Sequence, residues 1–508
     1  MDATAQNMIE TAWLIAPELG VMAAATLLVL LGSLLPTATL EQRRKAGTVS
    51  VAFAALTFTC AFLLLLKLSG MSATKEVDVV PFVFDGLSRV LRPFSMLTGL
   101  SLLLLFRQRL NDRYPAEHLA CLIFIIAGMS LVAAVNDLTA MFVSLELVSI
   151  PTYVLLYLSR PKSRDLEATV KYFLLSIFSS GFVLYGMSFL LGAAGSTNFA
   201  IIRQSLQEPT GMVSVGMLQI ACVLIVAGLG FRVASVPFHF YAPDVFQGTS
   251  MPAAAFLAVV PKIAGFVALL RLVWSVLLTG ELHADFVALG KFGPAIFAGL
   301  AVLTMSVGNV LALLQTDLRR LLAYSSVAHA GYMLVGLAVP ASVHSPSGPQ
   351  AVIFYLLVYS TLTFGAFAVL VLLKKQDRNV ETIRDLNGLG ASAPLAAGLL
   401  AVFLFGLTGL PPTAGFWGKF NLFMAAWSTG TRVMQLLAIA LAVNAAIAAW
   451  YYLRLIKIAF LDTQAESAAV VSGGQIAALY GTVTVCAASV VALFFFPSAL
   501  WSLLQDLT

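Results

Sequence analysis

Charged residues are scarce in this chain: only 10% of its 508 residues are Asp, Glu, Lys or Arg, whereas 60% are hydrophobic. A soluble globular domain carries roughly a quarter charged residues and about one half apolar residues, so the composition excludes an ordinary soluble protein. A bundle of membrane-spanning helices, each of about 20 residues, accounts for such a length without further domains. We therefore expect an all-α polytopic membrane protein with a single membrane domain, 1–508.

Residues that hold metals or redox groups are also few. The four cysteines, Cys60, Cys121, Cys222 and Cys486, stand singly in apolar runs, and none forms the CxxC spacing of zinc or iron–sulfur sites. The five histidines show no pair at haem-ligating spacing, and no phosphate-binding glycine loop precedes a helix. We therefore expect no metal and no cofactor bound by this chain. The net charge of +5 reflects membrane topology and predicts no nucleic-acid partner.

Apolar runs of spanning length recur along the whole sequence. A hydrocarbon core of roughly 30 Å needs about 20 apolar residues, and on this basis we predict about fourteen transmembrane helices. The predicted spans are 13–35, 47–68, 87–106, 117–135, 138–158, 166–193, 213–246, 252–278, 292–314, 320–340, 350–374, 393–425, 431–460 and 474–497. Two of them, 213–246 and 393–425, are interrupted by proline.

Basic residues gather in the loops that follow the odd-numbered spans. These loops contain Arg43, Arg44, Lys45, Arg107, Arg109, Arg113, Arg160, Lys162, Arg164, Arg319, Arg320, Lys374, Lys375, Arg378 and Arg384. The loops after the even-numbered spans contain Lys75, Arg203, Lys291 and Arg432. Because cytoplasmic loops carry an excess of Lys and Arg, we predict that the odd loops face the cytoplasm and that both termini lie on the outer side.

The first interrupted span combines helix breakers with ionisable residues. In the stretch Gly228–Gly248, Arg232 lies five residues before Pro237, and His239 lies two residues after it. In lipid, a broken backbone is tolerated only where protein or water satisfies the freed polar groups. The break is therefore a candidate ion path.

The second interrupted span, Phe405–Lys419, has the same design, with Pro411 and Pro412 at mid-span and Lys419 after them. Paired broken helices in two halves of a chain point to a transporter site built from repeats. We predict two inverted repeats, because by parity the fourth span starts on the cytoplasmic side and the ninth on the other. The expected segments are 1–116 (helices 1 to 3, packing and assembly), 117–280 (repeat one), 290–460 (repeat two) and 470–508 (the last helix).

Several ionisable residues lie inside predicted spans, where a charge costs about 2.5 to 3.5 kcal/mol at the helix centre. Glu146 lies about eight residues into its helix, roughly 12 Å deep, and Lys262 about ten residues, roughly 15 Å deep. Desolvation favours neutral lysine and a nearby carboxylate favours the charged form, so moving the acid switches proton affinity. We predict a midplane proton relay of Glu146, a cation on the seventh helix, Lys262 and Lys419. Water between them would be held by Ser144, Ser176, Ser179, Tyr324, Ser325 and Tyr359.

Each candidate also has a structural alternative. Lys171 follows Glu167 by four residues, so the two can form an intrahelical ion pair near the interface. Lys419 can cap the carbonyl groups that the second break frees. His329 and His239 can be satisfied core histidines as readily as proton carriers.

Three runs carry a resemblance to a known family. They are Phe-Val-Ser-Leu-Glu-Leu at 142–147, Val-Pro-Phe-His-Phe-Tyr-Ala-Pro-Asp-Val-Phe-Gln-Gly at 236–248, and Gly-Leu-Pro-Pro-Thr-Ala-Gly-Phe-Trp-Gly-Lys-Phe at 409–420. These runs, and nearly the whole chain around them, resemble the antiporter-like membrane subunits of respiratory complex I.

The resemblance implies fourteen helices with two inverted five-helix repeats, each containing a discontinuous helix. It also implies proton translocation driven by quinone reduction elsewhere, so the chain would be a translocase subunit without a redox centre of its own. NADH, FMN, iron–sulfur clusters and quinone would be used by other subunits. The implied partners are the other membrane subunits of complex I, including a neighbouring antiporter-like subunit, and the lipid of a bacterial inner membrane.

Carried over position by position, the family's fifth-helix glutamate is Glu146, and its lysines on the sixth, eighth and twelfth helices are Lys171, Lys262 and Lys419. The position on the seventh helix differs from the family's pattern, because this chain has Arg232 where the family has lysine. A guanidinium is effectively never deprotonated in proteins, so we do not expect Arg232 to carry the proton. We hypothesise that it pairs with Glu146 as an electrostatic gate and that Lys262 is the loading site.

Three other functions remain open from the sequence. A cation/proton antiporter subunit of the Mrp type shares the broken helices, but sodium wants several oxygen ligands and the midplane groups here are mainly cations. A non-pumping scaffold would use the same charges only to lock subunits together. The related subunit of a membrane-bound hydrogenase or plastid-type complex is the third.

Overall fold

A computed structural model describes residues 12–34, 39–69, 80–107, 114–159, 163–207, 214–278, 287–340, 346–375, 378–461, 470–471 and 476–505. Of the basic residues that predict the topology, Lys75, Arg109, Arg113, Arg160, Lys162 and the side chain of Arg164 lie outside the described part. The chain divides into two compact units. The first holds the residues up to Arg232 together with Ile263–Phe292, and the second holds Val233–Lys262 together with the residues from Gly293 onward.

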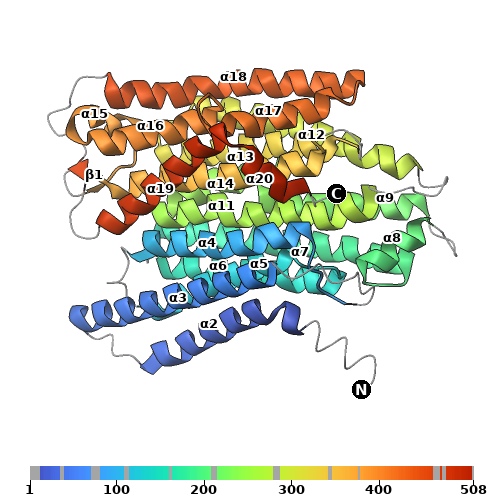
Figure 1. The fold of residues 1–508 in the computed structure, drawn as a ribbon, viewed down its shortest axis with the longest axis horizontal. Helices are drawn as coiled ribbons and strands as arrows, with labels where there is room; N and C mark the ends of the chain where they lie inside the picture. Colours follow the sequence, from blue (N-terminus) through green and yellow to red (C-terminus); the bar gives the residue numbers. More distant parts are fainter. Residues whose placement is uncertain are drawn as a thin grey trace. The chain divides into compact units, whose positions relative to one another are not determined.

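The first unit is helical in all its long elements. These are α2 (Ala16–Leu34), α3 (Leu40–Ser69), α4 (Gly86–Phe106), α5 (Pro115–Val132), α6 (Leu138–Ser159), α7 (Ser163–Ala194), the short α8 (Phe199–Gln207), α9 (Val215–Val233) and the π-helical η3 (Leu269–Leu278). Within this unit α5 packs against α2, α4 and α6, and α7 packs against α6 and α8 (Figure 1). The helix α8 was not among the predicted elements.

The second unit begins with the broken helix. Its helical elements are η2 (Phe238–Phe240), α10 (Tyr241–Gly248), α11 (Met251–Ala268), α12 (Val287–Leu313), α13 (Leu318–Ala338), α14 (Gly348–Leu372), η5 (Ile383–Leu386), α15 (Leu389–Ser392), α16 (Pro394–Thr408), α17 (Ala414–Trp427), α18 (Arg432–Phe460), α19 (Ile476–Phe495) and α20 (Ser498–Leu504). The end of α11 and the start of α12 group with the first unit. A small antiparallel sheet, in the order β2-β1-β3, is made by β1 (Leu373–Lys375), β2 (Arg378–Asn379) and β3 (Val470–Val471).

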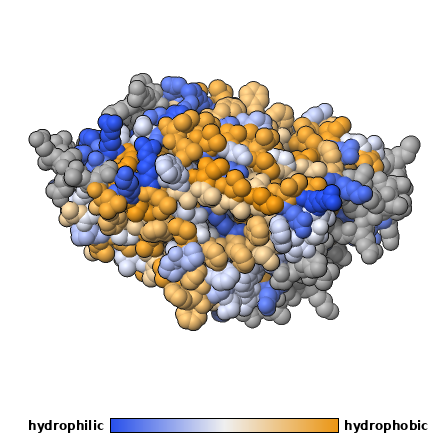
Figure 2. Space-filling model, turned by 90° about the horizontal axis from the view of Figure 1, so that it is seen from above, coloured by the Kyte–Doolittle hydropathy of each residue, from blue (hydrophilic) through white to orange (hydrophobic). Residues whose placement is uncertain are grey.

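Membrane-spanning character is confirmed by the helix lengths. Within the described ranges, 13 helices are long and apolar enough to cross a bilayer. The predicted span 393–425 is divided into α16 and α17, which are shorter than the others, so the expectation of about fourteen spans holds when this broken helix is included. The face shown in Figure 2 carries extensive hydrophobic surface, as expected for helices that contact lipid.

The core of the second unit is α14, which lies against α13, α16, α17 and α19. Its sequence is apolar on all sides and carries no charge, which is the pattern of a helix buried by its neighbours. It contributes Tyr355 and Tyr359, both fully buried, as polar groups in an otherwise apolar interior.

A buried ion pair joins three helices of the first unit. The Arg92 guanidinium on α4 donates two hydrogen bonds to the Glu18 carboxylate on α2, at 2.8 and 2.6 Å, and a third to the carbonyl of Leu14. The hydroxyl of Ser130 on α5 donates to the same carboxylate at 2.5 Å. Sequence patterns did not reveal this pair, because its members lie 74 positions apart and only the folded chain brings them together.

A second arginine, Arg271, anchors η3 inside the first unit. It forms an ion pair with Asp85, the N-cap of α4, and donates to the carbonyl of Ala133. Burial raises the pKa of Asp85, but the charge and hydrogen bonds of Arg271 outweigh burial and leave the pKa below its ordinary value. The carboxylate therefore stays ionised and holds η3, the continuation of α11.

Candidate functional site

The first break begins where α9 ends at Val233. Ala234 has a positive φ of 58°, and Pro237 has no backbone N–H to continue a helix. The chain then forms one turn of 3-10 helix, η2, before α10. The freed N–H of Val236 donates to the Thr304 hydroxyl on α12 at 3.0 Å, so protein rather than lipid satisfies this group. His239 lies half-buried within η2.

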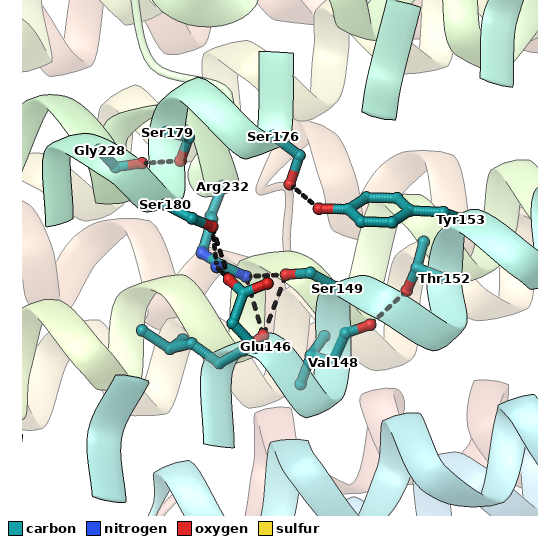
Figure 3. A network of polar contacts seen from close by, with 11 residues as sticks. Glu146, Val148, Ser149, Thr152, Tyr153, Ser176, Ser179, Ser180, Gly228 and Arg232 are labelled. Atoms are coloured by element: carbon teal, nitrogen blue, oxygen red, sulfur yellow. Dashed lines mark hydrogen bonds and ion pairs between the residues drawn. The ribbon is translucent and has the colours of Figure 1, made fainter. Parts of the chain in front are cut away.

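At the end of α9, Arg232 points into a polar cluster with α6 and α7 (Figure 3). Its guanidinium forms an ion pair with Glu146 at 2.9 Å and donates to the Ser149 hydroxyl and, at 3.1 Å, to the carbonyl of Leu145. The Ser180 hydroxyl donates to the Glu146 carboxylate at 2.5 Å. The arginine is buried and the glutamate is 21% exposed. The pairing that the sequence hypothesis required is therefore present in the first unit.

Close helix contact brings these groups together. A Cβ atom at Gly228 on α9 would lie 2.6 Å from the Ser179 carbonyl oxygen on α7, which leaves room for glycine alone. The Ser179 hydroxyl in turn donates to the Gly228 carbonyl at 2.7 Å. A larger residue at 228 would push α9 away and lengthen the contacts of Arg232.

Lys171 is placed differently from the other candidates. Its ammonium group pairs with Glu167, one turn earlier on α7, at 2.7 Å, and the two side chains are 45% and 64% exposed. This is the intrahelical pair that the i, i+4 spacing predicts. In its exposure this pair differs from the pair of Arg232 with Glu146, whose arginine is buried.

Lys262 lies in the second unit and is almost fully buried. Its ammonium group donates to the backbone carbonyl of Ser326 on α13 and lies 5.3 Å from the centre of the Tyr359 ring. The Tyr359 hydroxyl bonds to the Ser326 hydroxyl at 2.8 Å and donates to the carbonyl of Ala258. In the part of the chain that the structure describes, all of these partners are neutral. Among the described residues, the polar partners of the Lys262 amino group are therefore a carbonyl oxygen and an aromatic ring, and neither carries a charge.

The second break has a different local cause. The residue after α16 is Gly409, whose φ of +89° ends the helix, and the N–H of Leu410 returns to the carbonyl of Phe405 at 3.1 Å. Pro411 and Pro412 follow, and α17 starts at Ala414. This closure uses the carbonyl of Phe405 but leaves the last two carbonyls of α16, at 407 and 408, in need of donors.

Lys419 supplies those donors. From α17 its buried ammonium group donates to the carbonyls of Leu407 and Thr408, at 2.9 and 2.8 Å, and it lies 4.8 Å from the centre of the Tyr332 ring. The capping role that the sequence offered as an alternative is therefore real. It does not exclude proton transfer, because the same bonds place the ammonium group on a fixed site with neutral partners.

Replacing Gly409 by alanine is expected to lower the stability of the protein. A Cβ atom there would lie 2.8 Å from Lys419 Cδ, and the positive φ adds about 1 to 3 kcal/mol of strain. Gly430→Ala is the matched control, because φ is +70° there but nothing lies within 4 Å of the added Cβ. The amount of folded protein in the membrane and its thermal stability in mild detergent would be measured. Equal stability of the two variants would contradict the prediction.

His329 lies in the interior of α13, three residues after Ser326, whose carbonyl binds Lys262, and three residues before Tyr332, whose ring lies against Lys419. Its Nδ1 bonds to the Tyr355 hydroxyl at 2.5 Å and its Nε2 to the Tyr452 hydroxyl at 2.9 Å. Tyr452 bonds onward to the hydroxyl of Ser325. Both ring nitrogens thus have partners that can donate or accept, which is the arrangement a proton shuttle needs.

The sequence identified His329, Ser325 and Tyr359 but missed Tyr355, Tyr452 and Tyr332. One signal was available: Tyr355 and Tyr359 stand four residues apart, on one face of an apolar helix. No pattern within α18 or α13 marks Tyr452 or Tyr332 as neighbours of the histidine. In the described residues no group of three or more His, Cys, Asp or Glu could hold a metal ion, and the four cysteines are free.

Together these features define a helical membrane protein with two discontinuous helices and with ionisable side chains buried beside the breaks, a design typical of ion-translocating proteins. The model of one family, described as NADH:quinone oxidoreductase/Mrp antiporter, transmembrane, matches residues 135–445. The chain belongs to this family, and the resemblance to antiporter-like membrane subunits is confirmed.

Relatives of known name agree. The NADH-quinone oxidoreductase subunit N of Rhodospirillum rubrum is 35% identical over 457 residues, which cover 88% of this chain and 89% of that protein. The subunit of the same name from Trichlorobacter lovleyi is 41% identical over 369 residues, covering 72% and 71% of the two chains.

Solved structures share the fold. A chain of respiratory complex I from Thermus thermophilus is 31% identical, with a TM-score of 0.77 over 95% of this chain and 97% of that chain. A chain of the Mrp complex from a Dietzia species has the same TM-score at 20% identity, covering 98% and 96% of the two chains, which shows a shared fold alone.

Proposed function

We propose that this chain is a proton-translocating membrane subunit of a bacterial NADH:quinone oxidoreductase, of the subunit N type. It would lie in the inner membrane with both termini outside, next to a second antiporter-like subunit among other membrane subunits. NADH, FMN, iron–sulfur clusters and quinone would be bound by other subunits, and this chain would contribute to the enzyme without a redox centre. The names and coverage of its relatives support this assignment.

The observation that carries the proposal is the state of the two lysines in the second unit. Lys262 and Lys419 are buried, and their described partners are carbonyl oxygens and aromatic rings. A buried ammonium group with neutral partners can lose its proton at modest cost, whereas a salt-bridged one is held in the charged form. His329, with tyrosine hydroxyls on both ring nitrogens, would pass the proton between them.

In the first unit the pair of Glu146 and Arg232 would act as the electrostatic gate. Arg232 stays charged, so the proton would not reside on it, and the movable charge is that of Glu146. Glu146 is partly exposed on the surface of the chain, and it is the member of the pair whose charge can change. Lys171 and His239 would have secondary roles, because both are more exposed than the buried lysines.

The two predicted repeats, 117–280 and 290–460, would provide one broken helix each. Each break has a cation beside it. Arg232 lies at the end of the helix before the first break, and Lys419 lies in the helix after the second break. The midplane groups are cations rather than clustered oxygen ligands, which favours protons over sodium as the transported ion.

Proton uptake by inverted membrane vesicles during NADH oxidation tests the proposal. Replacing Lys419 by methionine is expected to lower pumping per NADH with the complex assembled, and pumping should not depend on sodium. Lys45→Met, in the exposed pair with Glu41, is the matched control and should behave as wild type. Unchanged pumping in Lys419→Met, or lost assembly with normal pumping per assembled complex, would favour a scaffold instead.

A further inference from the structure

A second polar cluster lies beside Lys419, centred on Asn309 of α12. This asparagine is fully buried, and its amide nitrogen donates to the Tyr332 hydroxyl at 2.9 Å and to the backbone and side-chain oxygens of Asn444, at 3.0 and 3.1 Å. Its amide oxygen accepts a bond from the Tyr451 hydroxyl at 3.1 Å. Donor and acceptor are therefore both satisfied, and the orientation of the amide is determined by partners on α13 and α18.

Tyr332 connects this cluster to the lysine. Its hydroxyl accepts the bond from Asn309, and the centre of its ring lies 4.8 Å from the ammonium nitrogen of Lys419. A ring face at this distance stabilises a cation, and more so where water is excluded. The ring position depends on the hydroxyl, because rotation of the tyrosine side chain would break the bond with Asn309.

Two kinds of group thus stabilise the charged form of Lys419. The carbonyls of Leu407 and Thr408 belong to the backbone beside the break and move with it. The ring of Tyr332 belongs to α13 and is held from α12. The second interaction is therefore adjustable by side chains that never touch the lysine.

We propose that Asn309 is a positioning residue for Lys419: by holding the Tyr332 hydroxyl it keeps the aromatic ring against the ammonium group and sets how tightly the lysine binds its proton. This inference rests on the proposed proton relay. Asn444 and Tyr451 orient Asn309 and act one step further away.

The other groups near Lys419 are few. Among the residues that the structure describes, Tyr332 on α13 lies against Lys419. One step away, His329 on α13 bonds to Tyr355 on α14 and Tyr452 on α18, and Tyr451 on α18 bonds to Asn309. The neighbouring helices α16 and α19 carry no Asp, Glu, Lys, Arg or His. His329 is the one residue in this set that titrates near neutral pH in water, so its contribution has to be separated in the test.

The experiment measures proton pumping per NADH as a function of pH, in vesicles that contain the whole complex. Asn309→Leu releases the ring, so Lys419 should bind its proton less tightly. The profile should move to lower pH by about half a unit to one and a half units, as expected for loss of one cation–π contact from which water is excluded. Tyr332→Phe keeps the ring but removes the acceptor, and should give the same shift. Tyr332→Leu removes the ring and should give at least as large a shift.

Matched variants separate positioning from packing. Ser306→Ala removes an acceptor of Asn444, at 3.3 Å, and leaves the bond between Asn309 and Tyr332 intact, so its profile should match wild type. Asn309→Leu and Ser306→Ala both leave the bonds of His329 to Tyr355 and Tyr452 in place, so a difference between their profiles does not arise at His329. A fall in assembled complex with an unmoved profile in Asn309→Leu and Tyr332→Phe would overturn the proposal, as would an equal shift in Ser306→Ala. If Lys419→Met pumps normally, the proton relay itself is wrong, a result distinct from failure of the positioning role.

Discussion

Replacing Lys262 by methionine is expected, on the proposed proton relay, to reduce proton pumping through this subunit to roughly a hundredth or less, since positioned acid–base groups contribute about 10²- to 10⁴-fold. Assembly should stay close to wild type. The reason is that Lys262 is buried among neutral partners, so an apolar side chain of similar length removes a desolvated charge without orphaning an acid.

Arginine at the same position distinguishes proton transfer from charge alone. Lys262→Arg keeps a permanent cation that does not release its proton, so its pumping should be as low as that of Lys262→Met. If arginine supported normal pumping, the residue would act through its charge and not as a proton carrier. Pumping per NADH in inverted vesicles is the measurement, and Lys45→Met on the exposed surface of α3 is the control.

Removing one partner of the buried pair Glu18–Arg92 is expected to destabilise the first unit by about 3 to 5 kcal/mol, because it leaves the other charge buried without compensation. Glu18 and Arg92 are 0% and 1% exposed, so little solvent is available to replace the lost partner. Glu18→Ala and Arg92→Met should each reduce the amount of assembled complex and its thermal stability in mild detergent.

A double replacement supplies the critical comparison. Glu18→Met combined with Arg92→Met removes both charges, and well-packed apolar residues commonly replace a buried pair at little cost or with a gain. We therefore expect the double variant to be more stable than either single variant. Equal or greater loss in the double variant would mean that the pair has net stabilising value, or that Ser130 and the carbonyl of Leu14 depend on it.

Local rules predicted where each broken helix is interrupted. Pro237 and Pro412 lack the N–H that helix continuation requires, and a glycine at 409 can adopt the positive φ of a helix end. Sequence spacing also predicted two local contacts, the ion pair of Lys171 with Glu167 and the capping of α16 by Lys419. Each contact joins residues that lie within a few helical turns of one another. Such contacts depend on neighbours in the chain.

The polar interior of the second unit was only partly predictable. His329 stood out because an ionisable side chain in an apolar span is costly. Its partners Tyr355 and Tyr452 come from α14 and α18, and Asn309 reaches Tyr332 from α12. Periodicity places a side chain on a face of its helix but does not say which other helix packs there, so these contacts required the tertiary structure.

Amino-acid order alone determined that the chain is a helical membrane protein with two proline-broken spans, because lipid demands long apolar helices and leaves few exceptions. It also determined which charges lie inside those spans. Folding decided which of these side chains have a partner of opposite charge. Arg232 pairs with Glu146 and Arg92 pairs with Glu18, whereas Lys262 contacts a backbone carbonyl and the ring of Tyr359. The physical reason is that the energy of a buried charge depends on partners within a few ångströms, and those partners come from distant parts of the sequence.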